Sequence, residues 1–224
     1  MRVVSWNCNG AFRKKYKYIQ KLDADIYVIQ ECEDPCIVNN TEFKEFANNY
    51  IWIGNKNKGL GIFAKNNICI EKNDWNSFGL EWFLSCIING KVNLIALWGC
   101  GNYIEDICVY FNIYEDKIKH LEDVLICGDF NSNVCWDKKG RNRTHESLVK
   151  RLEDYGLESC YHVTRKEKQG NESMPTFYMY RKEEKSYHID YSFYYKDKID
   201  SFDVGRYDEW ISLSDHMPIV LDIK

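Results

Sequence analysis

The stretch VLICGDFNSN, residues 124–133, decides how the rest of this 224-residue chain is interpreted. Four apolar residues run into Gly128, which is the pattern of a buried strand, and Asp129 and Asn131 follow directly. Side chains alternate along an extended chain, so we expect Asp129 and Asn131 on one side and Phe130 packed on the other. We expect Gly128 to let the backbone turn there. The sequence therefore predicts two polar side chains at the end of a core strand.

Other apolar runs also end in polar groups. These groups are Asn7 after residues 2–6, Glu31 after residues 25–30, His188 with Asp190, and Asp215 with His216. In an α/β sheet, ligands bind beyond strand ends, because side chains from distant segments converge there. Carboxylate and amide oxygens suit Mg²⁺ or Mn²⁺, and no cysteine belongs to the set. The strand ends therefore predict a divalent metal site with oxygen ligands.

The periodicity of apolar residues predicts a mixed α/β fold. We expect strands at residues 2–7, 25–31, 59–65, 83–88, 91–98, 124–130, 175–180, 186–195 and 218–223. We expect helices at residues 12–22 and 103–121, and a third that Thr144 caps and Gly156 stops. Early strands alternate with helices and later ones do not. This pattern indicates an α/β sandwich, with two sheets face to face and helices outside, in a single domain spanning residues 1–224.

Composition narrows the class of protein. The formal net charge of -4 is unlike that of a strongly basic DNA-coating protein, although a local basic patch is compatible with it. No apolar run reaches the length of about 18 residues that a membrane span needs, and the first residues do not resemble a signal peptide. Ten scattered cysteines without a CxxC pair indicate reduced thiols. We therefore expect a cytoplasmic monomer without membrane contact.

Five motifs together resemble the endonuclease/exonuclease/phosphatase superfamily. They are SWNCNG (5–10), IQEC (29–32), GDFNSN (128–133), YHIDYSF (187–193) and SDHMPIV (214–220), in the order that this superfamily shows. The superfamily includes deoxyribonuclease I, abasic-site endonucleases, sphingomyelinases, inositol-polyphosphate phosphatases and some deadenylases. The resemblance covers essentially the whole chain. It implies a four-layered α/β sandwich, with two mixed, mostly antiparallel sheets, and metal-dependent cleavage of a phosphate ester.

The same resemblance implies which residues bind the metal. Glu31 is the implied main Mg²⁺ ligand, assisted by Asn7 and Asp215. Asn9 stands where several nucleases of the superfamily carry an aspartate, so a second metal position is not implied.

The resemblance also implies the roles of four catalytic residues. Asp129 holds or deprotonates the attacking water, and Asn131 orients that water or contacts the phosphate. His216 donates to a phosphate oxygen and balances the charge that builds in the transition state. Asp190 holds the imidazole ring of His216 and favours its cationic form.

Substrate contacts are less specified by the sequence. His188 lies two residues before Asp190, and we expect it on the same side of the strand as a second phosphate contact. Arg141 and Arg143 lie in the basic segment 137–143 and contact either a substrate phosphate or only solvent. The neighbouring Trp136 either stacks on a base or covers the core.

The sequence thus favours a Mg²⁺-dependent phosphodiesterase, an endonuclease or exonuclease acting on DNA or RNA. Two alternatives stay open. One is a phosphatase or phosphodiesterase acting on a small or lipid phosphate. The other is a non-catalytic phosphate-binding module on the same fold.

Overall fold

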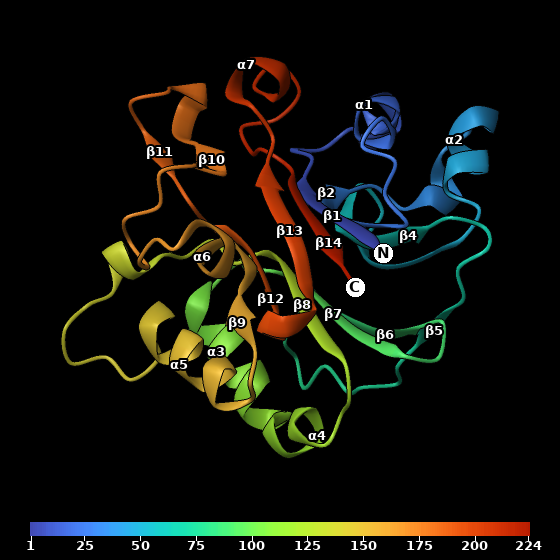
Figure 1. Ribbon diagram of the computed structural model, residues 1–224. Helices are drawn as coiled ribbons and strands as arrows, with labels where there is room; N and C mark the ends of the chain where they lie inside the picture. The colour runs from blue at the N-terminus through green and yellow to red at the C-terminus, as the bar shows by residue number, and fades with distance from the viewer.

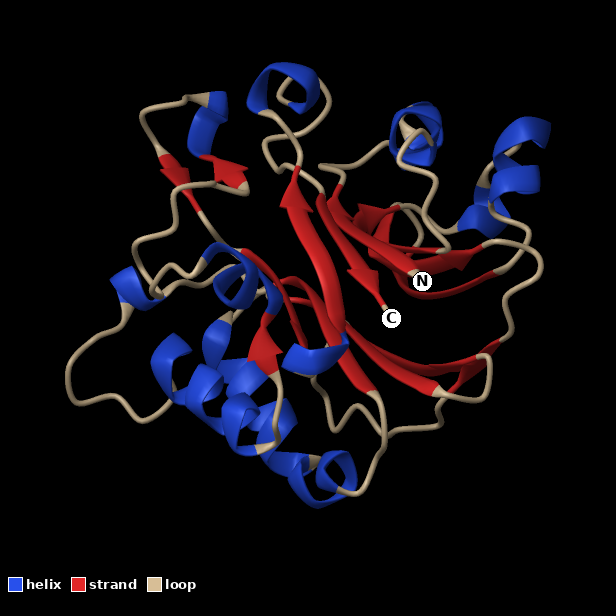
Figure 2. Ribbon diagram, in the orientation of Figure 1, coloured by secondary structure: helices blue, strands red, loops and turns tan.

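The computed structural model describes all residues from Met1 to Lys224. Two six-stranded sheets pack face to face, and a two-stranded sheet lies at their edge. Figure 1 shows α3, α4 and α5 covering one sheet, whereas α1 and α2 lie beyond the other. Figure 2 shows the strands in the middle and helices on both sides. The predicted four-layered sandwich is therefore confirmed.

The first sheet joins the two ends of the chain. Its strand order is β13 (Ile199–Val204), β14 (Ile219–Ile223), β1 (Arg2–Asn7), β2 (Ile26–Cys32), β4 (Lys58–Ala64) and β3 (Tyr50–Asn55). Only β1 and β2 are parallel, so their carboxyl ends meet at one edge of the sheet. The β2–β4 register shifts between Gln30 and Cys32, which leaves Glu31 at a bulge at this edge.

The second sheet contains the strand formed by the start of the stretch 124–133. Its order is β5 (Ile70–Lys72), β6 (Phe83–Ile88), β7 (Val92–Trp98), β8 (Val124–Asp129), β12 (Asp190–Tyr194) and β9 (Glu158–Ser159). Here β7 and β8 are the parallel pair. The antiparallel pairing of β12 with β8 sets Asp190 opposite Asp129. The short strands β10 (Phe177–Tyr178) and β11 (Ser186–Tyr187) form the separate two-stranded sheet.

Two apolar clusters hold the layers together. The larger includes Val28 and Leu125 between the sheets and extends to Trp6 and Phe43 on the outer side of the first sheet. The smaller packs the second sheet against its covering helices and contains Phe130, which is fully buried against Tyr191. The predicted packing of Phe130 into the core is confirmed. All ten cysteines are unpaired.

The helices are more interrupted than their periodicity predicted. Residues 12–22 divide at Lys15 into a 3-10 turn (Phe12–Lys14) and α1 (Tyr16–Gln20). The carboxylate of Glu33 accepts the N–H groups of Phe12 and Arg13 at the start of the turn. Residues 103–121 divide into α3 (Ile104–Ile113) and α4 (Glu115–Lys119) at Tyr114, whose ring stacks on Trp75.

The predicted helix after Thr144 is α5 (His145–Asp154), and a capping box at Thr144 begins it. Three short helices were not predicted: α2 (Thr41–Phe46), α6 (Cys160–Arg165) and α7 (Tyr207–Trp210). The expected strand at 175–180 is limited to β10, after which a 3-10 turn follows at Met179–Arg181. No helix has both the length and the apolar character to cross a membrane.

Gly128 lies inside β8 and not at a turn, which corrects the expectation from the sequence. Its φ is 153°, and a Cβ atom there would lie 1.9 Å from the carbonyl oxygen of Leu97 in β7. Glycine is therefore required for the close approach of two parallel strands.

Replacing this glycine tests that requirement. Gly128→Ala should lower the free energy of unfolding by about 3 kcal/mol or more, because the strands must separate to admit the methyl group. Gly140→Ala is the matched control: its φ is also positive (85°), but nothing lies within 4 Å. Gly140→Ala should lower the free energy of unfolding by only about 1–2 kcal/mol. Equal urea midpoints for the two variants would contradict the close-approach explanation.

Candidate active site

Three buried side chains converge where the two sheets meet. Asp129 ends β8, Asp190 begins β12, and His216 lies in the loop before β14. The Nδ1 atom of His216 donates to Oδ2 of Asp190 at 3.0 Å, and its Nε2 atom lies 3.9 Å from Oδ2 of Asp129. Asp129 and Asp190 have no exposed surface, and His216 is 4% exposed. The imidazole therefore sits between two carboxylates that solvent does not reach.

Burial and mutual charge set the protonation of this group. Burial raises the pKa of Asp129 to about 7, although the His216 cation and the amide of Asn7 oppose the increase. Burial opposes protonation of His216, but the carboxylates of Asp190 and Asp129 outweigh it and raise its pKa to about 10. The two carboxylates thus favour the imidazolium form of His216, and burial favours proton uptake by Asp129.

The amide of Asn7 connects this group to the predicted metal ligands. Its Nδ2 atom donates to Oδ2 of Asp129 at 3.0 Å and to Oε1 of Glu31 at 3.3 Å. Its Oδ1 atom accepts the backbone N–H of Asn9, whose own Nδ2 donates to Asp215 at 2.5 Å. Residues from β1, β2, β8 and the loop before β14 therefore form one continuous polar cluster.

Three non-glycine residues of this cluster adopt left-handed backbone conformations. The φ angles are 51° at Asn9, 60° at Glu31 and 47° at Asn131. At Asn131 the conformation is held by its backbone N–H, which donates to Oδ1 of Asp129 at 2.8 Å. Such conformations are unfavourable and persist only where surrounding contacts fix them, which is common at functional sites.

Ser214 was missed by the sequence argument as a member of the site. Its hydroxyl donates to the carbonyl of Asn7 at 2.7 Å and accepts the backbone N–H of His216 at 3.0 Å. The indole N–H of Trp6 donates to the carbonyl of His216 at 2.9 Å. Together they fix the loop before β14 against β1. The only signal was the place of Ser214 in the SDH motif.

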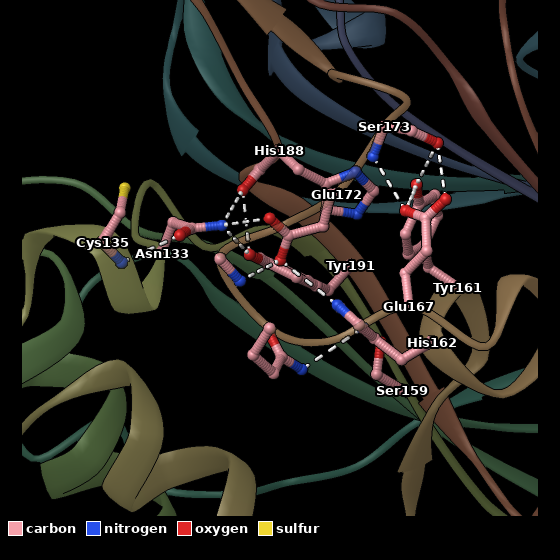
Figure 3. A network of polar contacts seen from close by, with 12 residues as sticks. Asn133, Cys135, Ser159, Tyr161, His162, Glu167, Glu172, Ser173, His188 and Tyr191 are labelled. Carbon is pink, nitrogen blue, oxygen red and sulfur yellow. Dashed lines mark hydrogen bonds and ion pairs between the residues drawn. The ribbon is translucent and has the colours of Figure 1, made fainter.

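A second polar network joins the segments that follow Asp129 and precede Asp190 (Figure 3). The amide of Asn133 donates to the carbonyl of His188 and the hydroxyl of Tyr191, each at 3.0 Å, and to Glu172 at 3.2 Å. Burial opposes ionisation of Glu172, but hydrogen bonds from His162 and Gly170 lower its pKa to about 2. This network ties the loop after Asp129 to the segment that leads into Asp190.

The structure corrects the expected placement of His188. Strand β12 begins at Asp190, so His188 does not share its strand geometry. Its ring is 3% exposed and lies 4.3 Å from the ring of Tyr161, and its Nδ1 bonds the carbonyl of Met174. Figure 3 shows it within the network. His188 has no free surface for a phosphate, because burial is nearly complete.

The other predicted substrate contacts lie at the surface. Arg141 is paired with Glu105 at 2.8 Å, and Arg143 is exposed in the loop before α5. Trp136 is 42% exposed and packs its ring 4.7 Å from that of Tyr187. The contact of either arginine with substrate remains a prediction.

The donor set fits a hard divalent cation. Glu31, Asn7 and Asp215 offer oxygen ligands, which a hard divalent cation prefers. The ligand atoms of Asp129, Asp190 and His216 lie within 4.8 Å of one another and form a separate, buried group. The carboxylate of Glu31 already pairs with a cation, because Nζ of Lys58 lies 3.2 Å from its Oε2 atom. The same Nζ lies 4.9 Å from the ring centroid of Trp98. Lys58 had no sequence signal, since it begins β4 far from every motif.

This fold, together with buried carboxylates, a histidine and an oxygen-rich cluster, defines a hydrolytic phosphoesterase. The family profile described as "Endonuclease/Exonuclease/phosphatase family" matches residues 4–216, and the chain belongs to that family. The family resemblance inferred from the motifs is thereby confirmed. No curated protein sequence matches the chain.

Solved structures with the same fold include nucleic-acid enzymes. The 3' phosphatase NExo from Neisseria, bound to a product DNA hairpin, aligns with a TM-score of 0.73 and 16% identity over 100% of this chain and 99% of its own. The 3'-5' exonuclease NExo from Neisseria meningitidis aligns with a TM-score of 0.71 and 17% identity over 100% of both chains. An AP endonuclease from Archaeoglobus fulgidus aligns with a TM-score of 0.72 and 15% identity, over 100% of this chain and 99% of its own.

The buried His145, beside Ser132, predicts a pH dependence of stability. Its Nδ1 is 2.7 Å from the hydroxyl of Ser132, and burial lowers its pKa from 6.5 to about 4. The unfolded chain takes up the proton first, so stability is complete above pH 6.5 and is lost as the pH falls toward 4. His145→Asn should flatten the dependence of the melting temperature on pH in this interval. The exposed His120→Asn should leave the slope unchanged; an unchanged slope in His145→Asn would contradict the assignment.

The ammonium of Lys58 should compete with a metal ion for Glu31. Lys58→Met should raise the affinity for Mn²⁺ roughly two- to fivefold, a modest gain because Lys58 is solvent-exposed. Isothermal titration calorimetry measures this affinity without substrate. Lys56→Met, at the tip of the same hairpin, is the control and should bind Mn²⁺ as the wild type does. Weaker binding by Lys58→Met would show that the ammonium assists the site.

Proposed function

We propose that the protein is a Mg²⁺-dependent phosphodiesterase that hydrolyses phosphodiester bonds of DNA or RNA. The observation that carries the proposal is the position of Asp129. Its buried carboxylate bonds Asn7 and lies beside the His216–Asp190 pair. A group that accepts a proton near pH 7 is thus placed between an oxygen-rich cluster and a fixed cation.

Glu31, Asn7 and Asp215 would hold Mg²⁺ or Mn²⁺ in this proposal. The bound cation would neutralise phosphate charge and lower the pKa of a coordinated water. The three residues come from β1, β2 and the loop before β14, and Asn7 and Asn9 link them by hydrogen bonds. The ion pair of Lys58 with Glu31 supports the view that this cluster attracts cations.

Asp129 acts as the general base that removes a proton from the attacking water. A general base works best when its pKa lies near the working pH, and burial raises the pKa of Asp129 to about 7. Asn131 orients the water or the phosphate, because its amide follows directly and its backbone is bonded to Asp129.

His216 donates from Nε2 to a phosphate oxygen and offsets the negative charge that develops during attack. Asp190 accepts the hydrogen bond from Nδ1, which fixes the ring and stabilises its cationic form. The pairing of Asp190 with the opposite residue Asp129 keeps base and donor on the same edge of the sheet.

A nucleic-acid substrate is supported by the cations around the cluster and by the relatives. Lys58 lies at Glu31, and Nζ of Lys15 donates to the carbonyl of Cys8 at 2.6 Å. NExo is described with a DNA hairpin as its product, on the same fold. A small or lipid phosphate is the alternative substrate, and a non-catalytic phosphate-binding module is the alternative class. A cytoplasmic location fits ten unpaired cysteines, and we propose a monomer.

Two substitutions distinguish the proposed roles. With Mg²⁺ and a panel of duplex DNA, single-stranded DNA, RNA and inositol phosphates, Asp129→Asn should lose about 10²–10⁴-fold in kcat at every metal concentration. Glu31→Gln should instead require more Mg²⁺ to reach its maximal rate. Asp208→Asn, on the exposed side of α7, is the control. No turnover of any substrate by the wild type would favour the binding module, and selective turnover of inositol phosphates would favour the alternative substrate.

A further inference from the structure

A cleft of about 540 Å³ lies beside the candidate active site, between the end of the β3–β4 hairpin, residues 72–85 and helix α3. Its lining includes two amide side chains and four aromatic rings: Asn55, Asn73, Trp75, Trp82, Phe83 and Tyr110. Its volume is within the range of small-molecule sites. None of the catalytic or metal roles proposed above uses these residues.

One wall of the cleft is a rigid aromatic surface. The rings of Phe83 and Tyr110 stack at 4.1 Å with an angle of 6° between their planes, and Trp75 stacks at 4.5 Å on Tyr114. Trp75 and Trp82 are both partly exposed. Partly exposed aromatic rings that their neighbours hold in place can receive a further flat ring at little conformational cost.

Trp82 connects this wall to the candidate metal ligands. Its ring lies 4.8 Å from that of Trp98, and its carbonyl accepts the backbone N–H of Trp98 at 3.0 Å. Nζ of Lys58 lies over the other indole, 4.9 Å from the Trp98 ring centroid, and 3.2 Å from Glu31. The indole of Trp98 and the ammonium group of Lys58 therefore lie between Trp82 and Glu31.

The rim of the cleft offers groups that recognise the edges of a flat polar ring. The amide of Asn73 donates to Ser85 at 2.7 Å, which leaves its Oδ1 as a free acceptor. Asn55 is exposed at the hairpin end, opposite Lys58 in the β3–β4 register. Amide side chains of this kind pair with base edges in nucleic-acid complexes.

We propose that this cleft takes the base of the nucleotide next to the cleaved phosphate, stacked on Trp82. The inference rests on the proposed phosphodiesterase function and adds the substrate class to it. The base must be unpaired, because the faces of bases in a duplex are already covered by their neighbours. The cleft thereby favours single-stranded nucleic acid over small phosphates that carry no flat ring, because only a flat ring can stack on Trp82.

Two small diesters with the same leaving group test the cleft. Wild-type protein with Mn²⁺ should hydrolyse thymidine 5'-p-nitrophenyl phosphate with a lower KM than methyl p-nitrophenyl phosphate. Trp82→Ala should raise KM for the thymidine diester about tenfold or more, with kcat nearly unchanged. KM for the methyl diester should not change. Trp82→Phe should retain most of the discrimination. Tyr18→Ala, an exposed aromatic residue on α1, is the control and should change neither value.

Asn55→Trp gives a second variant that does not remove a partly buried ring. A bulky side chain at the hairpin end should obstruct the cleft and raise KM for the thymidine diester alone. Equal KM values for both diesters, unaffected by either variant, would overturn the cleft proposal and leave the phosphodiesterase intact.

A binding measurement separates this inference from the proposed function. Thymidine 5'-monophosphate should quench the tryptophan fluorescence of the wild type, and the quenching should be lost in Trp82→Ala. If neither diester is hydrolysed but the quenching is seen, the proposed function fails and the base site stands. If quenching is absent from the wild type, the base site fails.

Discussion

The arrangement of the whole site depends on keeping the carboxylate of Asp129 buried. Solvent would hold such a group as an anion of ordinary acidity, whereas burial raises its pKa to about 7. Burial without partners would be costly, so donors surround the carboxylate: the amide of Asn7, the backbone of Asn131 and, farther away, the His216 imidazolium. The same contacts that make the burial tolerable also hold Asp129 and His216 in the positions that their proposed roles as base and phosphate donor require.

The fold brings these partners together through two parallel strand pairs. In each sheet only one pair is parallel, β1 with β2 and β7 with β8. Parallel strands deliver their carboxyl ends to one edge, which places Asn7 near Glu31 in one sheet. The face-to-face packing then sets Asn7 within hydrogen-bond distance of Asp129 in the other sheet. Gly128 permits the close approach of β7 and β8 just before Asp129.

Long-range contacts decided the elements that the sequence argument missed. The helix expected at 103–121 divides at Tyr114, whose ring packs on Trp75, a contact that periodicity cannot reveal. His188 was expected beside Asp190, but β12 starts only at Asp190, and the ring turns into a network with Tyr161. Lys58 reaches Glu31 only because β4 pairs with β2 in the folded sheet.

The sequence alone determined the fold class and five members of the polar cluster, because strands and their polar ends are local patterns of residue type. Asn7, Glu31, Asp129, Asp190 and His216 could each be named from the end of an apolar run. Only the tertiary structure decided how they are connected. Distances, burial and protonation depend on which strand ends meet, and the cleft beside Trp82 exists because three distant segments pack together. Such contacts are made across the fold, so no stretch of sequence contains them.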